Sequence, residues 1–281
     1  METNAVEAKL TYLAPGSKIN RRFTSPGRDI NTGIYETHSV LIHDGRPIAN
    51  HFTLNEHGFT LLPHKSKVSD FDDKAQINSV YLKEMEQVLL AATGADSFSP
   101  FGVPTIRSSA AKPGGTVQEP GADVHVDLSP DRVNQRAETV YQNAFPTGPG
   151  FKRFIATSFW RCLSPGPQDW PLALCECGSV SADEGTPSTL YFVDEMPDEK
   201  TRMGYIPGEE QQMAGSAFNY NPAHRWWFFS NMIPDEVVIL KFYDSDHSRA
   251  WRVPHTAFFD NTQANAVTRK SIEVRSIVFF E

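Results

Sequence analysis

The sequence has few cysteines, no long apolar run and no excess of positive charge. Three cysteines among 281 residues, an odd number in a long chain, argue against a framework of disulfide bonds. No stretch approaches the ~18 apolar residues that a membrane-spanning helix needs. The 26 Lys and Arg residues are outnumbered by 34 Asp and Glu residues, which gives a net charge of −8. A surface for nucleic acid or for an anionic membrane needs a basic patch, so we expect neither partner.

The N-terminal residues are also not expected to act as a signal peptide. A signal peptide starts with basic residues and continues with an apolar stretch, whereas this chain begins Met1-Glu-Thr-Asn-Ala-Val-Glu. The composition, 40% hydrophobic and 21% charged, is that of an ordinary globular protein. We therefore expect a soluble intracellular protein, located in the cytoplasm.

Two of the three cysteines, Cys175 and Cys177, are expected to be small buried side chains. Cys175 and Cys177 flank Glu176 and would share one face of a strand. A zinc site normally needs four ligands, and the sequence has no second pair of cysteines. Free cysteine is among the residues most often buried, which favours a packing role over a metal site.

The distribution of apolar and turn residues predicts a mainly β chain with two helices. The first 65 residues contain short apolar runs bounded by turn residues. One helix is expected from a cap at Ser69 or Asp70 to a stop at Gly94, and a second after Ser129-Pro130. Seven strands are expected later, at Phe154–Cys162, Leu172–Cys177, Thr189–Val193, Trp226–Ser230, Glu236–Asp244, Arg252–Phe259 and Lys270–Phe280. Many short strands with turns between them predict a sandwich or barrel, with the helices packed outside.

Two other segments have a structural and a functional interpretation. Residues 95–123 are rich in Gly, Pro and Ser and are expected to form a long loop, either a lid over a site or a surface segment. The aromatic run Trp226-Trp227-Phe228-Phe229 is expected in the core rather than in a substrate wall, because such side chains bury large areas.

The most informative motif is Val124-His125-Val126-Asp127. In an extended chain His125 and Asp127 point to the same side, where an imidazole and a carboxylate can bind adjacent positions of one metal ion. A third ligand would complete the two-histidine, one-carboxylate face that leaves positions open on Fe(II). A His-x-Asp pattern arises by chance in many chains, so the assignment of a metal site needs support from another part of the sequence.

That support comes from the C-terminal part of the chain. His255 follows Asp127 after 128 positions, and Arg269 and Ser271 follow His255. The order His-x-Asp, a long gap of strands, His and then Arg-x-Ser resembles the arrangement in Fe(II)/2-oxoglutarate oxygenases. A planar guanidinium matches a carboxylate two hydrogen bonds at a time, so Arg269 suits the distal carboxylate of 2-oxoglutarate. The alternatives are a structural role for His255 and a solvated charge for Arg269.

Further segments resemble the AsaB-type hydroxylase/desaturase family over most of the chain. They are Gly58-Phe-Thr-Leu, Val68-Ser-Asp-Phe-Asp-Asp, Phe159-Trp-Arg, Asp169-Trp-Pro-Leu-Ala-Leu-Cys, Met232-Ile-Pro-Asp-Glu-Val, Lys241-Phe-Tyr-Asp-Ser-Asp, Pro254-His-Thr-Ala-Phe and Ser271-Ile-Glu-Val-Arg. The chain departs from the family at Val126, where Asn is frequent, and at Glu176, where Asp is frequent. Neither departure removes an expected ligand.

The resemblance implies a double-stranded β-helix, a jelly-roll barrel with Fe(II) at its mouth. It implies His125, Asp127 and His255 as the iron ligands. It also implies 2-oxoglutarate and O₂ as cosubstrates, with ascorbate as an additive in vitro, and hydroxylation or desaturation of a small natural product. We expect residues 1–281 to form a single oxygenase domain, with residues 1–95 packed on a barrel core of residues 120–281.

The sequence leaves alternatives open for the residue that anchors the cosubstrate and for the function of the protein. Arg269 with Ser271 is the first candidate for the anchor, while Arg275 on the same strand face and Arg161 beside Trp160 are others. Arg275 could instead pair with Glu273 or another carboxylate, because a buried arginine needs an anionic partner. A non-catalytic barrel partner of another pathway enzyme and a metal-dependent oxygenase or isomerase without 2-oxoglutarate stay open, as does a homodimer. Segments 95–123 and 199–224 are expected to select the substrate.

Overall fold

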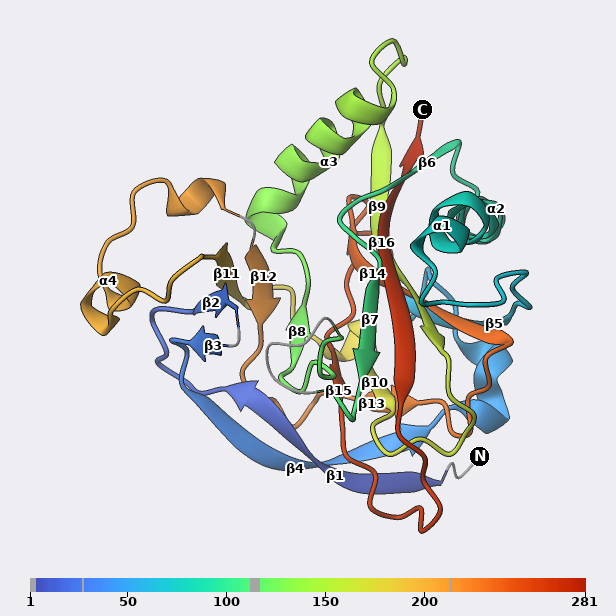
Figure 1. Cartoon of the computed structure of the whole chain (residues 1–281), viewed down its shortest axis with the longest axis horizontal. Helices are drawn as coiled ribbons and strands as arrows, with labels where there is room; N and C mark the ends of the chain where they lie inside the picture. The colour runs from blue at the N-terminus through green and yellow to red at the C-terminus, as the bar shows by residue number, and fades with distance from the viewer. Residues whose placement is uncertain (1–3, 27, 112–116, 213) are drawn as a thin grey trace.

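Strands dominate the computed structural model of this chain, which describes residues 4–26, 28–111, 117–212 and 214–281 (Figure 1). One sheet is built from β1 (Ala5–Leu13), β2 (Arg21–Ser25), β3 (Arg28–Asn31), β4 (Tyr35–Asp44), β8 (His125–Val126), β10 (Leu172–Cys175), β11 (Thr186–Phe192), β12 (Ala214–Ala217), β13 (Trp226–Phe228) and β15 (His255–Ala257). The other contains β5 (Phe59–Pro63), β6 (Ser97–Pro100), β7 (Thr105–Ser108), β9 (Arg153–Cys162), β14 (Glu236–Asp244) and β16 (Lys270–Phe280). The predicted mainly β architecture is confirmed.

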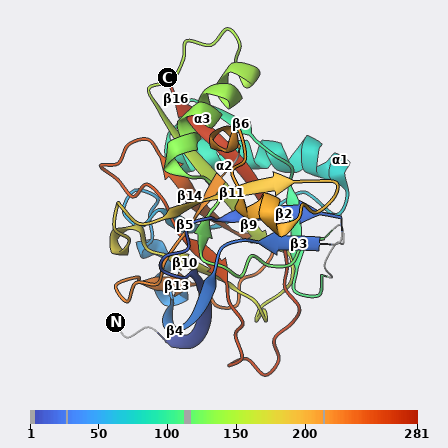
Figure 2. The ribbon, with the colours of Figure 1, turned by 90° about the vertical axis from the view of Figure 1, so that its left-hand side faces the viewer.

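Strand neighbours in both sheets are often far apart in the sequence. The larger sheet has the order β1-β4-β13-β10-β15-β8-β12-β11-β2-β3, and the smaller one has β5-β14-β9-β16-β6, with β7 paired to β16. The helical segments are α1 (Lys74–Gln76), a π-helical turn (Ile77–Tyr81), α2 (Leu82–Thr93), α3 (Pro130–Ala144) and α4 (Glu199–Met203), with 3-10 turns at Arg46–His51, Cys177–Ser179 and Glu209–Gln211. Figure 1 shows β11, β2 and β3 together on the left, on the side of the molecule away from α1 and α2, and Figure 2 shows these strands from that side.

The long strands β9 and β16 separate two buried layers. Side chains on a strand alternate between its faces, so Ile155 and Phe159 of β9 join one apolar cluster while Phe154 and Trp160 join the other. The first cluster includes Tyr81, Met85 and Leu89 and lies under α2. The second faces the larger sheet. This arrangement explains why β9 and β16 carry buried side chains on both faces.

The first predicted helix ends where expected but begins later. Gly94 adopts the left-handed conformation with φ 72° at its C-terminus, as predicted. The cap at Ser69 or Asp70 was wrong, because Asp73 accepts hydrogen bonds from the amides of Ala75 at 2.8 Å and Gln76 at 3.4 Å. Serine and aspartate are both good caps, so residue type alone did not distinguish the three positions.

The predicted long loop at residues 95–123 is wrong in part. It contains β6 and β7, which pair antiparallel with the two halves of β16. Both strands have four residues and carry serine, which leaves no alternating pattern to detect. Residues 112–116 of this segment lie outside the described part of the chain.

Other expectations about packing are confirmed. Cys162, Cys175 and Cys177 are buried and unbonded to one another. Trp226 and Phe229 belong to the core. Strands β14 and β16 have the predicted bounds, whereas the predicted strand Arg252–Phe259 is reduced to β15. No helix among the described residues combines the length and apolar character needed to cross a membrane.

A buried ionic cluster joins β9 to β14. The fully buried Asp244 accepts hydrogen bonds from Arg153 at 2.7 and 2.9 Å and from Lys241 at 2.7 Å. A bulge between Lys241 and Tyr243 lets residues three apart on the strand meet on one side. Burial alone raises the pKa of Asp244, but the hydrogen bond from Arg153 and the charge of Lys241 outweigh it and lower the pKa below its usual value.

The cluster predicts a loss of stability in Asp244→Asn. The substitution leaves the buried Lys241 without a counter-charge, and we expect the free energy of unfolding to fall by about 3–5 kcal/mol at pH 7. Because the folded pKa of Asp244 is depressed, its contribution exists above the unfolded pKa and is lost as pH falls through the folded pKa. Urea unfolding between pH 7 and pH 3 should therefore show the two proteins converging in acid. An effect no larger than that of exposed Asp183→Asn would contradict the role of this cluster.

Candidate active site

Strand pairing places the two predicted histidine ligands side by side. The short strand β8 lies between β12 and β15, and His125 is the register partner of His255. The two imidazole centroids are 4.5 Å apart. Val126, between His125 and Asp127, is buried on the opposite face, so alternation along β8 turns His125 and Asp127 to the same side.

His125, Asp127 and His255 bring three metal-binding groups together. One ligand atom from each lies within 4.8 Å of the other two. The Nδ1 atom of His125 lies 2.6 Å from the Asp123 carbonyl oxygen, and Nδ1 of His255 lies 3.0 Å from that of Val253. Donation of Nδ1–H to these carbonyls leaves each Nε2 with its lone pair available. Two imidazoles and a carboxylate form a donor set that suits Fe(II), with positions open for other ligands.

The Asp127 carboxylate is shared between the histidine pair and an arginine. Its Oδ1 lies 3.2 Å from Nε2 of His125, and its Oδ2 lies 2.7 Å from Nε of Arg275. Oδ2 is buried and makes no hydrogen bond of good geometry with any described residue. Burial raises the pKa of Asp127, but the charge of Arg275 and the neighbouring imidazoles outweigh burial and hold it well below its usual value. Arg275 thus has a carboxylate partner, and it also lies 3.7 Å from Glu273.

The two imidazoles differ in their protonation equilibria. Burial lowers the pKa of His125, but the hydrogen bond and charge of Asp127 outweigh burial and raise it to about 9. Burial and the charge of His125 lower the pKa of His255 to about 4. Asp127 thus favours a positive charge on His125, and that charge disfavours a second one on His255, because two adjacent positive charges repel each other.

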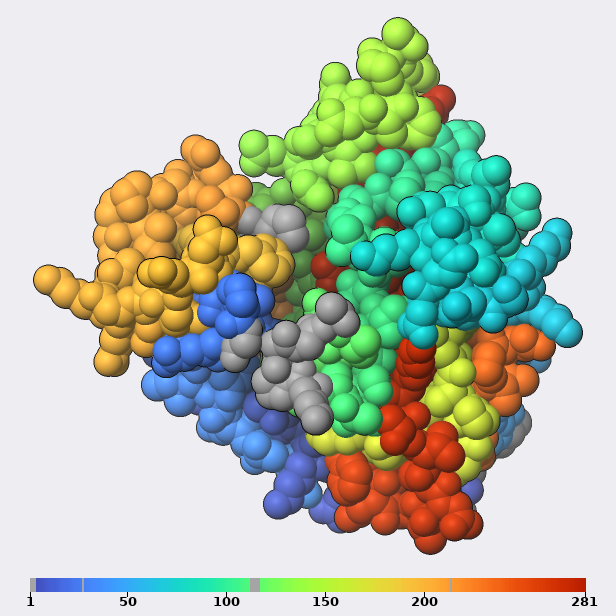
Figure 3. Space-filling view, viewed as in Figure 1, coloured from blue at the N-terminus to red at the C-terminus, as the bar shows by residue number. Residues whose placement is uncertain are grey.

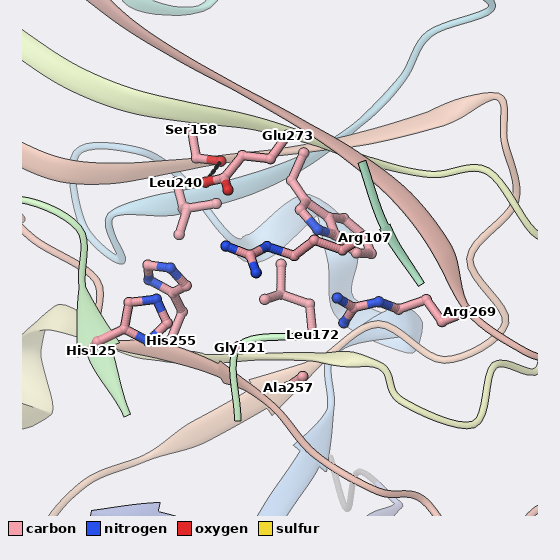
Figure 4. A pocket seen from close by; sticks show the side chains of 11 residues that line it. Arg107, Gly121, His125, Ser158, Leu172, Leu240, His255, Ala257, Arg269 and Glu273 are labelled. Carbon is pink, nitrogen blue, oxygen red and sulfur yellow. Dashed lines mark hydrogen bonds between the residues drawn. The ribbon is translucent and has the colours of Figure 1, made fainter. Parts of the chain in front are cut away.

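A cavity of about 30 Å³ adjoins the histidine pair (Figure 4). Its walls include the apolar side chains of Trp160, Leu172, Leu240 and Ala257. Glu273 also lines it and accepts a hydrogen bond from Ser158 at 3.0 Å. The remaining wall carries two guanidinium groups, those of Arg107 and Arg269.

Arg269 is the more deeply buried of these two arginines. It is 2% exposed, donates from Nη1 to the Trp170 carbonyl at 2.8 Å and stacks over the Trp160 ring. Its Nε is buried without a hydrogen-bond partner among the described residues. Burial is the main cause that lowers the pKa of Arg269 to about 10, and the charge of Arg107 adds to it. Ser271 is buried on the same strand face but is not part of the cavity wall.

Arg107 and Gly121 reach the cavity from the segment expected to be a loop. Arg107 lies on β7 opposite Ser271 of β16, and its Nη1 donates to the Glu119 carbonyl at 2.8 Å. In Figure 4 its side chain extends across the cavity toward the histidines. A Cβ atom at Gly121 would lie 3.1 Å from Cε1 of His125, so glycine permits this close approach. Sequence patterns did not identify Arg107, because the pairing of β7 with β16 is not visible in four residues.

The structure places Arg161 away from the cavity. It lies on the face of β9 that packs against α2, where it donates to the Tyr81 hydroxyl at 3.1 Å and to the His64 carbonyl at 2.9 Å. It also contacts the Pro234 carbonyl and the His64 imidazole. These hydrogen bonds use the donors of the guanidinium group. Arg161 thereby links the helical segment at Tyr81 to strand β9.

Comparisons with known proteins agree with this geometry. A family model described as an oxidoreductase/YMDC permease-like domain matches residues 10–279. The hydroxylase/desaturase CTB9 of Cercospora beticola is 30% identical over 88% of this chain and 78% of its own, and efuI of Hormonema carpetanum is 29% identical over 88% and 85%. The solved iron and alpha-ketoglutarate-dependent endoperoxidase NvfI superposes with a TM-score of 0.79, at 25% identity, over 98% of both chains.

The chain belongs to the hydroxylase/desaturase family of Fe(II)/2-oxoglutarate-dependent oxygenases. It is an oxidoreductase with the jelly-roll fold, and its cofactor and cosubstrates are Fe(II), 2-oxoglutarate and O₂. The expectations of fold, enzyme class and cofactors are therefore confirmed.

The position of Arg161 predicts that its substitution lowers the stability of the protein and leaves cosubstrate binding unchanged. Arg161→Gln leaves the Tyr81 hydroxyl and two carbonyls without their donor, so we expect the free energy of unfolding to fall by about 2–4 kcal/mol. We expect no change in the affinity for 2-oxoglutarate, measured by calorimetry on folded protein at low temperature. Weaker cosubstrate binding at unchanged stability would show that Arg161 acts in the site.

Proposed function

We propose that His125, Asp127 and His255 hold Fe(II) in this chain and that the enzyme hydroxylates or desaturates a small natural product. The observation that carries the assignment is the convergence of their three ligand atoms within 4.8 Å. Both imidazoles are oriented by main-chain carbonyls, which is the usual arrangement for histidine ligands. We also propose that residues 1–281 act as one domain, since a single apolar cluster includes residues from Val6 to Phe279.

Arg275 has a positioning role in this proposal. Its charge lies against Oδ2 of Asp127, so only Oδ1 faces the histidines. A carboxylate held in this way would bind a metal ion through one oxygen and leave neighbouring positions for cosubstrates. The bound iron would supply O₂ activation, coupled to oxidative decarboxylation of 2-oxoglutarate to succinate and CO₂.

Arg269 is proposed as the partner of the distal carboxylate of 2-oxoglutarate. It is a buried cation whose Nε has no hydrogen-bond partner and whose guanidinium forms no ion pair with any described carboxylate, and a bidentate carboxylate would satisfy it. We add Arg107 as a second contact, closer to the histidines, for the keto-acid end. Two guanidinium groups in one cavity repel each other, and a dianion with a carboxylate at each end offsets both charges.

The size of the cavity makes Arg107 a mobile element of this proposal. A volume of about 30 Å³ holds one or two water molecules, not a five-carbon diacid. Arg107 is the long, flexible side chain that crosses this space in Figure 4. We therefore expect its guanidinium to move aside and pair with the cosubstrate when 2-oxoglutarate enters. The apolar walls formed by Trp160, Leu172 and Leu240 would exclude water around the reacting groups.

The natural-product substrate is proposed from the names of the proteins that this chain resembles. Its relatives include proteins named hydroxylase/desaturase, dioxygenase and endoperoxidase from fungi. The range of these names indicates that one metal site supports several oxidative outcomes. Which outcome follows depends on how the substrate is placed, and fold alone does not determine this.

Metal binding tests the ligand assignment. We expect His125→Ala, Asp127→Ala and His255→Ala to weaken Mn(II) binding by at least about 100-fold, and Arg275→Gln by about 10- to 100-fold through loss of the restraint on Asp127. Anaerobic calorimetry with Mn(II), which replaces Fe(II), measures both effects. Exposed His51→Ala is the matched control and should bind normally. Full Mn(II) affinity in Asp127→Ala would refute the proposed site.

Cosubstrate binding tests the two arginines separately from catalysis. In protein loaded with Zn(II), we expect Arg269→Gln to weaken 2-oxoglutarate binding by roughly 30-fold or more and Arg107→Gln by about tenfold, because each loses a charge-assisted contact. Exposed Arg249→Gln serves as the control. An unchanged affinity in either variant removes that residue from the proposal, whereas no binding by the wild type would contradict the function itself.

A further inference from the structure

A second cavity, of about 180 Å³, lies beside the N-terminal turns of α3. Its walls include Ser129, Arg132 and Arg136 on one side and Gln211 and Gln212 on the other. Figure 3 shows α3 and the segment before Gln212 meeting on one face of the molecule. Among the described residues that line this cavity, two are cationic and none is acidic. The cavity therefore has a positive character that the metal centre does not explain.

Three polar atoms of the residues that line this cavity have no hydrogen-bond partner in the described part of the chain. Ser129 is fully buried at the N-cap position of α3, yet its Oγ neither caps the helix nor bonds any described residue. The Nε atoms of Arg132 and Arg136 are also buried without hydrogen bonds to described residues. A buried donor without an acceptor costs about 1–3 kcal/mol, so such groups normally face water or a ligand.

All three groups can donate hydrogen bonds, which defines the chemistry of an occupant. Arg132 uses Nη1 for the Gln212 carbonyl, and its nearest carboxylate is the exposed Asp131 at 3.7 Å from Nε. Arg136 lies with its guanidinium over the Phe101 ring. The positive end of the α3 dipole adds to the two charges. An oxyanion, which accepts several hydrogen bonds and carries negative charge, satisfies these requirements together.

The cavity borders the metal-binding motif. Ser129 follows Asp127 by two residues, which span at most about 7 Å of chain. On the opposite side, Ala214 begins β12, whose Ser216 is the register partner of Val126. A molecule seated here would thus lie against the strand pair that presents His125 and Asp127.

We propose that this cavity binds the acidic group of the substrate, a carboxylate or a phosphate, through Arg132, Arg136 and Ser129. This inference rests on the proposed function, because it assigns the substrate of the same oxygenase to the class of organic anions. A water molecule occupies about 30 Å³ in the liquid, so 180 Å³ holds an oxyanion with a short carbon chain. 2-Oxoglutarate remains assigned to the cavity of Arg107 and Arg269.

The experiment titrates folded protein, loaded with Zn(II) and saturated with 2-oxoglutarate, with butyrate and separately with inorganic phosphate. Ligand NMR detects weak binding of either probe. We expect saturable binding of at least one, weakened about tenfold or more in Arg132→Gln and in Arg136→Gln, and retained in the Lys variants. Ser129→Ala should weaken it less, and exposed Arg249→Gln should leave it unchanged. Preference for butyrate assigns a carboxylate substrate, and preference for phosphate assigns a phosphorylated one.

Two results would overturn the inference. One is the absence of saturable binding of both probes at millimolar concentration, and the other is binding that both Gln variants leave intact. Circular dichroism identifies a variant that fails to fold, and the Lys variants then carry the test through their retained charge. Loss of Zn(II) or 2-oxoglutarate binding in the wild type would instead contradict the proposed function, so the two failures are distinguishable.

Discussion

A charge that folding removes from water needs an opposite charge or hydrogen bonds in compensation, and this constraint orders the polar interior of the protein. Asp244 meets Arg153 and Lys241, and the cluster is complete within the chain. Asp127 meets Arg275 on one oxygen only, and its second oxygen faces the histidines. The Asp244 cluster is structural because its charges are compensated by one another. In the Asp127 cluster, the oxygen that faces the histidines is available to a metal ion.

The alternation of side chains along β16 determines which charges reach the site. Arg269, Glu273 and Arg275 share one face of this strand, while Ile272 and Val274 pack under α2 on the other. A shift of one residue in the pairing with β9 would exchange these two sets. The ten register pairs from Ser271 to Phe280 resist such a shift. The stability of the apolar layer and the geometry of the cavity are thus two consequences of one register.

Local pattern predicted the convergence of His125 and Asp127, and the order of motifs along the chain added His255, but neither predicted the surroundings of this cluster. His125 and Asp127 are two residues apart, so the period of two in an extended chain alone placed them on one side. Arg161 and Arg107 depended on contacts between distant segments, and sequence periodicity does not report these. Arg161 has the opposite parity to Trp160 on β9, which could have placed it outside the cavity once Trp160 was assigned inward. For Arg107 no such signal exists, because β7 is recognisable only through its pairing with β16.

The overall charge of −8 and the cationic cavities act on different length scales. Beyond a Debye length of roughly 8–10 Å, salt screens the exposed carboxylates, so the acidic surface repels an anionic ligand only at close range. Inside the cavities the guanidinium groups are poorly screened, and hydrogen bonds add direction to their charge. In the two sites proposed above, affinity for 2-oxoglutarate and for an acidic substrate would therefore depend on a few arginines that line the cavities. An acidic protein can accordingly bind anions without electrostatic steering, at the cost of slower encounter.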